Sequence, residues 1–205
     1  MEESYKTLKI SSSDEFEEKR SRFIGYASPV KTEKEALDFI ADIKQKHWDA
    51  KHNVYAYCIR NGGIMRYSDD GEPQGTAGMP VLSVMQKEKL TDCVVVVTRY
   101  FGGILLGGGG LVRAYSHAAK LGIDSAGIII MEPWNVYSLV CDYTFYSKIE
   151  TFIRDSNGVI IDSQFTDNVK LKFRIKTETQ TDFINKLADL TNGKAEISFE
   201  KTIIS

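Results

Sequence analysis

The chain has 205 residues, which is long for one compact domain and sufficient for two small ones. Hydrophobic residues make up 42% and charged residues 26%, a composition typical of globular rather than disordered proteins. The net charge of −2 lacks the basic excess of proteins that bind nucleic acid over a broad face. Any contact with nucleic acid must therefore come from a local patch, and nothing in the sequence signals DNA specifically.

The location of the protein is predicted from three features of the sequence. The N-terminal segment lacks the basic start and apolar core of a secretory signal. Apolar runs such as that from Cys93 to Val97 are far too short to span a membrane. Cys58, Cys93 and Cys141 are odd in number and widely spaced, which indicates separate reduced thiols. We therefore expect a cytoplasmic protein without membrane contact.

The first part of the chain mixes predicted strands and helices. Strands are expected up to about Pro29, and Thr32 with Glu35 three residues later is typical of a capping box that begins a helix. The pattern then predicts a hairpin over 54–67, a short helix beginning at Pro80, and a strand over 92–98. Because that last strand has almost no polar face, we expect it to be buried on both sides. A glycine-rich loop and a long amphipathic helix follow.

The last part of the chain contains a weak internal repeat. A strand over 136–141, a helix ending at Asn157-Gly158 and a strand over 159–161 come first. The same order recurs as a strand over 169–175, a helix ending at Asn192-Gly193 and a strand over 195–199. This β-α-β-β-α-β order predicts a ferredoxin-like domain. The joint is predicted near Pro133, which gives an α+β protein with domains 1–133 and 134–205.

The most unusual stretch runs from Arg99 to Arg113 and opens the long helix. Glycine lets backbone N–H groups approach a ligand, and a helix start adds unpaired donors with a partial positive charge. These features predict an anion site, with phosphate as its usual ligand. The alternative is a tight turn that lets helix and strand pack closely. The residues of the predicted anion site are Arg99, Gly107, Gly108, Gly109, Gly110 and Arg113.

A second loop, over 68–76, is acidic. Asp69, Asp70 and Glu72 could hold a hard cation, but their spacing differs from that of an EF-hand, and the alternative is a solvated turn. Thr76, just before a helix, could instead donate its hydroxyl to a second phosphate-facing turn. His52 is a polar neighbour of these loops, and we expect a structural histidine bonded to the backbone. Neither a zinc-binding spacing nor a catalytic triad is visible, so no metal ligand and no catalytic residue is assigned.

Four blocks of sequence resemble the signature blocks of the IMPACT/YigZ family. They cover residues 18–24, 50–57, 68–78 and 98–115, and they occur in that order. The chain after Trp134 resembles the additional C-terminal domain of the bacterial members. At Gly108 many members carry a small residue other than glycine, which bears only on the stiffness of the loop.

The resemblance implies a first domain similar to the second domain of small-subunit ribosomal protein five and to domain IV of elongation factor G. It implies a second domain similar to domain V of the same factor. Eukaryotic relatives regulate translation initiation through an extra N-terminal domain that is absent from this sequence, so that role does not transfer directly. The family contributes no catalytic residues to the prediction.

Two functions remain open at this point. The first is a non-enzymatic binding protein in translation that contacts RNA or a ribosome-associated protein through the glycine-rich anion site, without a cofactor. The second is an enzyme or sensor for a phosphorylated small molecule or nucleotide, with Mg²⁺ held by Asp69, Asp70 or Glu72. The absence of a recognisable nucleophile or base favours the first. The sequence does not determine the oligomeric state.

Overall fold

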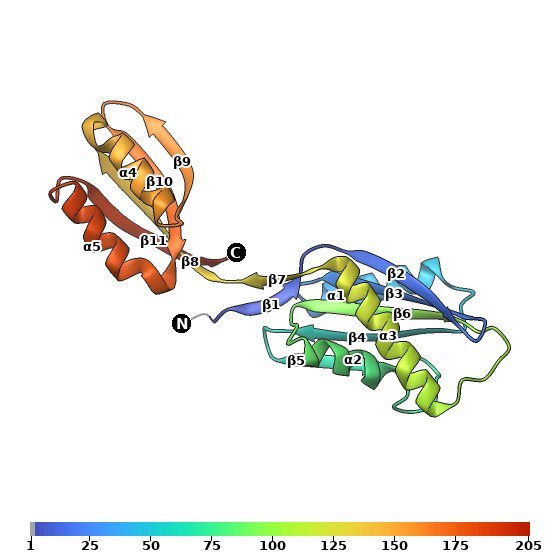
Figure 1. Ribbon diagram of the computed structural model, residues 1–205. Coiled ribbons are helices and arrows are strands. Elements are labelled where there is room, and N and C mark those ends of the chain that lie inside the picture. Colours follow the sequence, from blue (N-terminus) through green and yellow to red (C-terminus); the bar gives the residue numbers. More distant parts are fainter. Residues whose placement is uncertain (1–2) are drawn as a thin grey trace. The chain divides into compact units, whose positions relative to one another are not determined.

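The computed structural model describes residues 3–205 and divides into two compact units, Tyr5–Ile130 and Met131–Ser205 (Figure 1). Each unit has its own sheet, and each has its own buried apolar core. The predicted α+β class is confirmed. Within residues 3–205, none of the helices is both long and apolar enough to cross a membrane.

The N-terminal unit is built on a five-stranded sheet in the order β2-β3-β6-β4-β5, in which every neighbouring pair is antiparallel. The five strands of this sheet are β2 (Ser12–Glu18), β3 (Ser21–Pro29), β4 (His52–Ile59), β5 (Ile64–Ser68) and β6 (Cys93–Tyr100). A separate two-stranded sheet pairs β1 (Tyr5–Leu8) with β7 (Ile128–Met131).

Helices cover both faces of the five-stranded sheet. One face packs against α1 (Glu33–Lys46), whose predicted cap Thr32 accepts a hydrogen bond at Oγ1 from the Glu35 backbone. The Glu35 carboxylate accepts in return from the Lys31 backbone and not from that of Thr32, so the predicted capping box is only half formed. The other face packs against α2 (Gly78–Lys87) and α3 (Gly108–Ala126), which Figure 1 shows side by side. The central strand β6 is buried on both sides, as its apolar sequence predicted.

Helix α3 lies directly on the backbone of β3. A Cβ atom built at Gly25 would lie 1.9 Å from the Ala118 carbonyl oxygen, and one at Gly122 would lie 2.7 Å from the Gly25 carbonyl oxygen. No side chain larger than hydrogen fits at either position without moving backbone. This contact fixes α3 against the sheet and so positions the helix start, which faces the site described below.

All three cysteines are buried free thiols, two of which lie opposite each other in the register of β4 and β6. Burial raises the pKa of Cys58 to about 11 and raises the pKa of Cys93 as well. Thiolate, the reactive form, is therefore scarce at neutral pH.

The C-terminal unit has the predicted β-α-β-β-α-β order, with its sheet in the order β11-β8-β10-β9. Two of its strands are longer than expected, because β9 extends to Phe165 and β11 to Ile204. Pro133 stands at the first position of β8, a strand position that tolerates proline. The elements are β8 (Pro133–Cys141), α4 (Tyr143–Asp155), β9 (Val159–Phe165), β10 (Val169–Lys176), a short 3₁₀ turn (Thr177–Thr179), α5 (Gln180–Leu190) and β11 (Glu196–Ile204).

Candidate functional site

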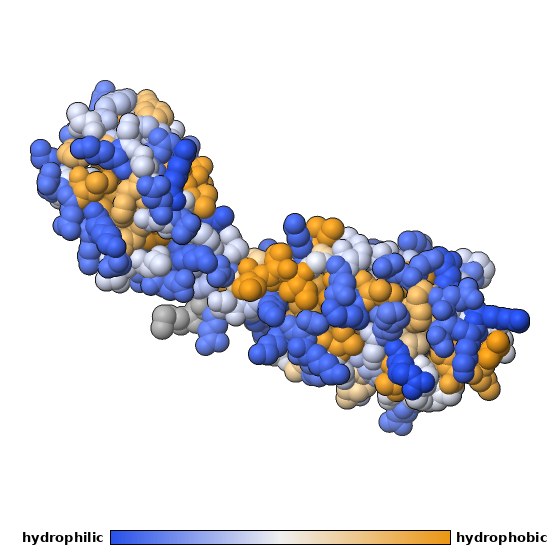
Figure 2. Space-filling model, in the orientation of Figure 1, coloured by the Kyte–Doolittle hydropathy of each residue, from blue (hydrophilic) through white to orange (hydrophobic). Residues whose placement is uncertain are grey.

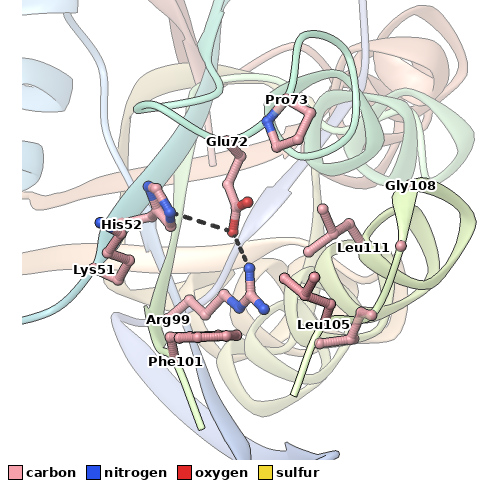
Figure 3. A pocket seen from close by; sticks show the side chains of 11 residues that line it. Lys51, His52, Glu72, Pro73, Arg99, Phe101, Leu105, Gly108 and Leu111 are labelled. Carbon is pink, nitrogen blue, oxygen red and sulfur yellow. Dashed lines mark hydrogen bonds and ion pairs between the residues drawn. The ribbon is translucent and has the colours of Figure 1, made fainter. Parts of the chain in front are cut away.

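A cavity of about 360 Å³ lies in the N-terminal unit, where both unusual loops of the sequence meet the start of α3. Figure 3 shows Lys51 and His52 on one side of this cavity, and Leu111 and Gly108 on the other. Arg99 comes from the end of β6 and His52 from the start of β4, and these two residues are partners in the register of the sheet. The remaining lining residues are Glu72, Pro73, Phe101, Leu105, Leu106 and Gly107.

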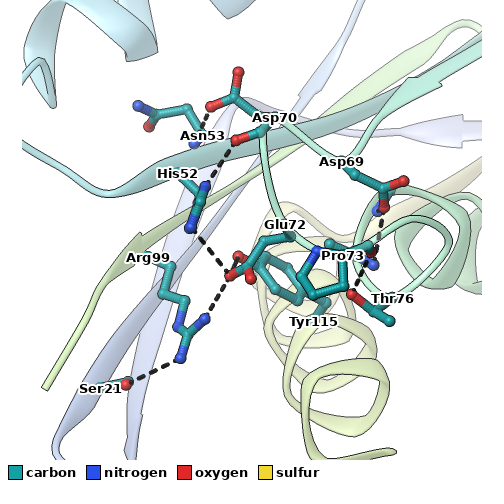
Figure 4. A network of polar contacts seen from close by, with 12 residues as sticks. Ser21, His52, Asn53, Asp69, Asp70, Glu72, Pro73, Thr76, Arg99 and Tyr115 are labelled. Atoms are coloured by element: carbon teal, nitrogen blue, oxygen red, sulfur yellow. Dashed lines mark hydrogen bonds and ion pairs between the residues drawn. The ribbon is translucent and has the colours of Figure 1, made fainter. Parts of the chain in front are cut away.

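Glu72 is the centre of a buried polar network (Figure 4). Its Oε1 accepts a hydrogen bond of 2.5 Å from Arg99 Nη1 and one of 2.7 Å from the hydroxyl of Tyr115. The Glu72 and Arg99 side chains are 4% and 6% exposed, so the two charges neutralise each other out of contact with bulk water. Burial and the Glu72 carboxylate raise the pKa of Tyr115, which keeps its phenol protonated as a donor.

His52 has one bonded and one open ring nitrogen. Its Nδ1 lies 2.7 Å from the carbonyl oxygen of Asp70, and because a carbonyl only accepts, Nδ1 carries the proton. This bond to the backbone is the one that the sequence predicted. The other nitrogen, Nε2, lies 3.7 Å from Glu72 Oε1, beyond hydrogen-bond distance, and the ring lines the cavity.

The acidic loop is held together by its own carboxylates. Both oxygens of Asp69 accept backbone N–H groups, from Gly75 and from Ala77 and Gly78 at the start of α2. The carboxylate of Asp70 binds Lys44 and the Asn53 backbone. With Glu72 bound to Arg99, the three carboxylates point to three different sets of partners. In the part of the chain that the structure describes, no group of three His, Cys, Asp or Glu side chains is placed to hold a metal ion.

The hydroxyl of Thr76 donates 2.6 Å to the carbonyl oxygen of Pro73 within this loop. The structure therefore uses Thr76, like Asp69, to shape the turn before α2. Because Asp69 also occupies the N–H groups at the start of α2, that helix end is already satisfied by a carboxylate.

The start of α3 differs, because no side chain caps it. Gly107 is the N-cap residue with φ of 73°, a conformation that favours glycine. The next three residues are glycines. Because they form the first turn, the helix itself provides no hydrogen-bond acceptor for their N–H groups. A Cβ at Gly108 would have its nearest neighbour at 3.9 Å, from Thr76, and one at Gly109 at 3.8 Å, from Arg113. Gly108 and Gly109 are exposed, whereas Gly110 is half-buried.

The two arginines of the predicted anion site are separated. Arg99 lies inside the cavity with its charge on Glu72, and its ring neighbours Phe23 and Phe101 are each 5.4 Å away. Arg113 lies on the exposed side of α3 and lines a second, smaller hollow of about 250 Å³ together with Glu18 and His117. The structure therefore places Arg99, Gly107 and Gly108 at one cavity, with Arg113 beside the helix start and outside it.

Several residues of the site escaped sequence reasoning. Lys51, Phe101 and Leu105 line the cavity. Tyr115 donates a hydrogen bond to Glu72, and Ser21 accepts one from Arg99. Tyr115 lies on the buried face of α3, where its hydroxyl, in an otherwise apolar row, is the signal that the sequence contains. Ser21 gave none, because its bond of 3.2 Å from the Gly102 backbone depends on the meeting of two distant loops.

A second buried histidine, His47, lies outside the cavity. Its Nε2 lies 2.6 Å from the Tyr26 hydroxyl and its Nδ1 2.8 Å from the Tyr100 hydroxyl. Since Tyr100 donates to Asp49, its oxygen accepts the proton of Nδ1, and Tyr26 donates to Nε2. Burial and two nearby cationic side chains lower the pKa of His47.

These features define an α+β protein with a ligand-sized cavity between a buried ion pair and an uncapped helix start. Two family models match the chain, the Impact N-terminal domain over residues 19–123 and a domain of unknown function over residues 139–194. The chain belongs to the IMPACT family.

Curated relatives agree with this assignment. The IMPACT family member YvyE of Bacillus subtilis is 41% identical over 195 residues, covering 95% of this chain and 90% of that protein. The IMPACT family member YigZ of Escherichia coli is 33% identical and covers 87% and 89% of the two chains. A crystal structure of a hypothetical protein matches with a TM-score of 0.62 at 30% identity, covering 98% and 99% of the two chains.

The eukaryotic relatives match over a smaller part of their length. The IMPACT homologue of Dictyostelium discoideum is 37% identical over 128 residues, which is 60% of this chain but 34% of that protein. The part that this chain shares with the eukaryotic protein is therefore limited, and the match does not extend to the rest of that protein.

Proposed function

We propose that the protein is a non-enzymatic RNA-binding protein that acts in translation and holds an RNA phosphate at the start of α3. The observation that carries the proposal is the uncapped N-terminus of α3, whose glycine donors open beside the cavity. The start of α2 serves as an internal comparison, because the Asp69 carboxylate already occupies it. The likeness to domains of elongation factor G that the family resemblance implies supports a place in translation.

Cationic groups near α3 extend the site beyond one phosphate. Lys51 lines the cavity, and Arg113 Nη1 lies 3.8 Å from the position of a Cβ at Gly109. Lys19 and Arg20 are exposed on the β2–β3 turn, whose backbone contacts Gly102. Figure 2 shows hydrophilic and hydrophobic side chains next to one another at this end of the N-terminal unit. The proposal therefore relies on these four local cationic residues, because the chain as a whole is acidic.

The test places a negative charge over the helix start without harming the helix. Gly109 has an ordinary φ and space for a side chain, and an acidic residue in the first turn stabilises a helix. Gly109→Asp should therefore weaken RNA binding by on the order of tenfold or more through like-charge repulsion, while the thermal melt stays the same or rises. Gly109→Asn, with the same shape and no charge, is the matched control and should stay within a few-fold of wild type.

The assay is fluorescence anisotropy with a labelled single-stranded RNA at several salt concentrations. Binding across several phosphates should weaken steeply with salt, and Arg113→Ala should reduce the slope by about one. If Gly109→Asp and Gly109→Asn bind RNA equally well, the phosphate does not lie at the start of α3 and the proposal fails.

The cavity supports one competing function, a sensor or enzyme for a phosphorylated small molecule, because about 360 Å³ falls within the range of small-ligand sites. In that case nucleotides or sugar phosphates should bind with little salt dependence and RNA should bind weakly or not at all.

A further inference from the structure

The polar end of the cavity presents two acceptors that lack hydrogen-bond donors. All contacts of the Glu72 carboxylate among residues 3–205 use Oε1, and Oε2 takes none, although the side chain is 4% exposed. His52 is 9% exposed, and in the neutral ring its Nε2 carries a lone pair, because Nδ1 holds the proton. Neither atom is sealed in protein, and both residues line the cavity. A ligand that fits here brings adjacent N–H donors.

Most of the rest of the cavity wall is apolar. Phe101, Leu105, Leu106, Leu111 and Pro73 form it, and Figure 3 shows the Phe101 ring lying flat along the Arg99 side chain. Phe101 is 45% exposed and Leu105 is 81% exposed, although both are large hydrophobic residues beside a cavity. An apolar wall with an exposed aromatic face suits a flat ring that stacks.

We propose that this cavity receives one unpaired base of the RNA, with its donor edge on Glu72 Oε2 and His52 Nε2. The proposal deepens the RNA-binding function above and rests on it. A nucleotide carries its phosphate at one end and its base at the other, which matches a cavity with helix donors at Gly108 and acceptors at His52 on the opposite side (Figure 3).

The acceptors select among the bases. Guanine presents two adjacent donors, N1–H and the N2 amino group, whereas adenine, cytosine and uracil each present donors on a single nitrogen of that edge. The O6 atom of guanine is an acceptor, and Lys51 beside His52 is a donor for it. Guanine should therefore bind best. In a duplex the same edge is paired, so the site takes single strands, ends or loops.

The decisive experiment compares RNA with and without one base. Two short labelled single strands of equal length carry the same phosphates, and one contains a guanosine where the other contains an abasic ribose, in an otherwise all-uridine context. Stacking and edge contacts should make the guanosine strand bind on the order of tenfold more tightly, with the same salt slope for both. Replacing guanosine by inosine removes the N2 amino group and should weaken binding several-fold.

A pair of neighbouring variants locates the base. Leu105 and Ile104 lie in the same exposed loop, but only Leu105 lines the cavity. Leu105→Ala should weaken binding of the guanosine strand and leave the abasic strand unchanged, whereas Ile104→Ala should change neither. Leu105 is 81% exposed and Ile104 41% exposed, so the fold is expected to tolerate both changes.

The outcomes separate this inference from the function on which it rests. If the abasic and guanosine strands bind equally well and both respond to Gly109→Asp, the phosphate site stands and the base site is overturned. Equal loss with Leu105→Ala for both strands, or a guanosine duplex that binds as well as the single strand, also overturns it. If no RNA binds, the RNA-binding function itself has failed.

Discussion

Replacing Glu72 by glutamine removes one charge of the buried ion pair and leaves Arg99 as a buried cation. The two side chains are 4% and 6% exposed, so solvent does not replace the lost partner. Breaking a buried pair from one side costs about 3–5 kcal/mol of unfolding free energy. In a domain of this size each kcal/mol lowers the melting temperature by roughly 4 °C, which gives a loss of about 12–20 °C for the N-terminal unit.

The assay is calorimetry of the full chain, in which the transition that shifts identifies the N-terminal unit. Asp38→Asn is the control, because it breaks the exposed Lys34–Asp38 pair and should leave the melting temperature nearly unchanged. In the double variant Glu72→Gln/Arg99→Met no buried charge remains and Tyr115 keeps an acceptor, so much of the loss should be recovered. If Glu72→Gln costs no more than Asp38→Asn, Arg99 does not depend on Glu72 and the reasoning is refuted.

Three further predictions concern the rest of the chain. The pKa of His47 is lowered in the folded state. Its contribution to stability should therefore be present above the ordinary pKa of about 6.5 and be lost as the pH falls through the folded pKa. Urea melts at pH 7.5 and 5.5 should show a smaller pH effect for His47→Gln than for wild type. The thiols of Cys58 and Cys93 should react with Ellman's reagent only after denaturation, and fast reaction in the native protein would contradict their burial. Residues 134–205, which have their own core, should fold alone, and an expressed fragment without a cooperative thermal transition would show otherwise.

The fold was accessible from the sequence because its signals are local. The helix cap at Thr32, the unbroken apolar run of β6 and the repeated helix stops at Asn157 and Asn192 each depend on a few neighbouring residues. The ends of strands were harder to predict. Strand β11 continues through charged residues, which it tolerates because it is an edge strand and solvent hydrates their side chains.

The candidate site was only partly accessible, because its charges are decided by contacts between distant loops. The glycine run predicted a helix N-terminus without a side-chain cap, and the structure contains one. The pairing of Arg99 with Glu72 joins residues 27 positions apart, and nothing local indicates that Arg99 is already neutralised. The same holds for Asp69, whose two carboxylate oxygens accept backbone N–H groups from Gly75 and from the start of α2.

The contact between Gly25 and Gly122 determines how α3 is placed on the sheet, and so where the helix start lies in the site. It lies within β3 and the last part of α3, several helical turns from the glycine donors at the opposite end. A methyl group at Gly25 would collide with the Ala118 backbone and force α3 and β3 apart, and because α3 is continuous from Gly108 to Ala126, this shift would move the helix start as well. Positions that never touch a ligand thus control the shape of the cavity, and variation at this glycine pair would alter binding while leaving every cavity residue unchanged.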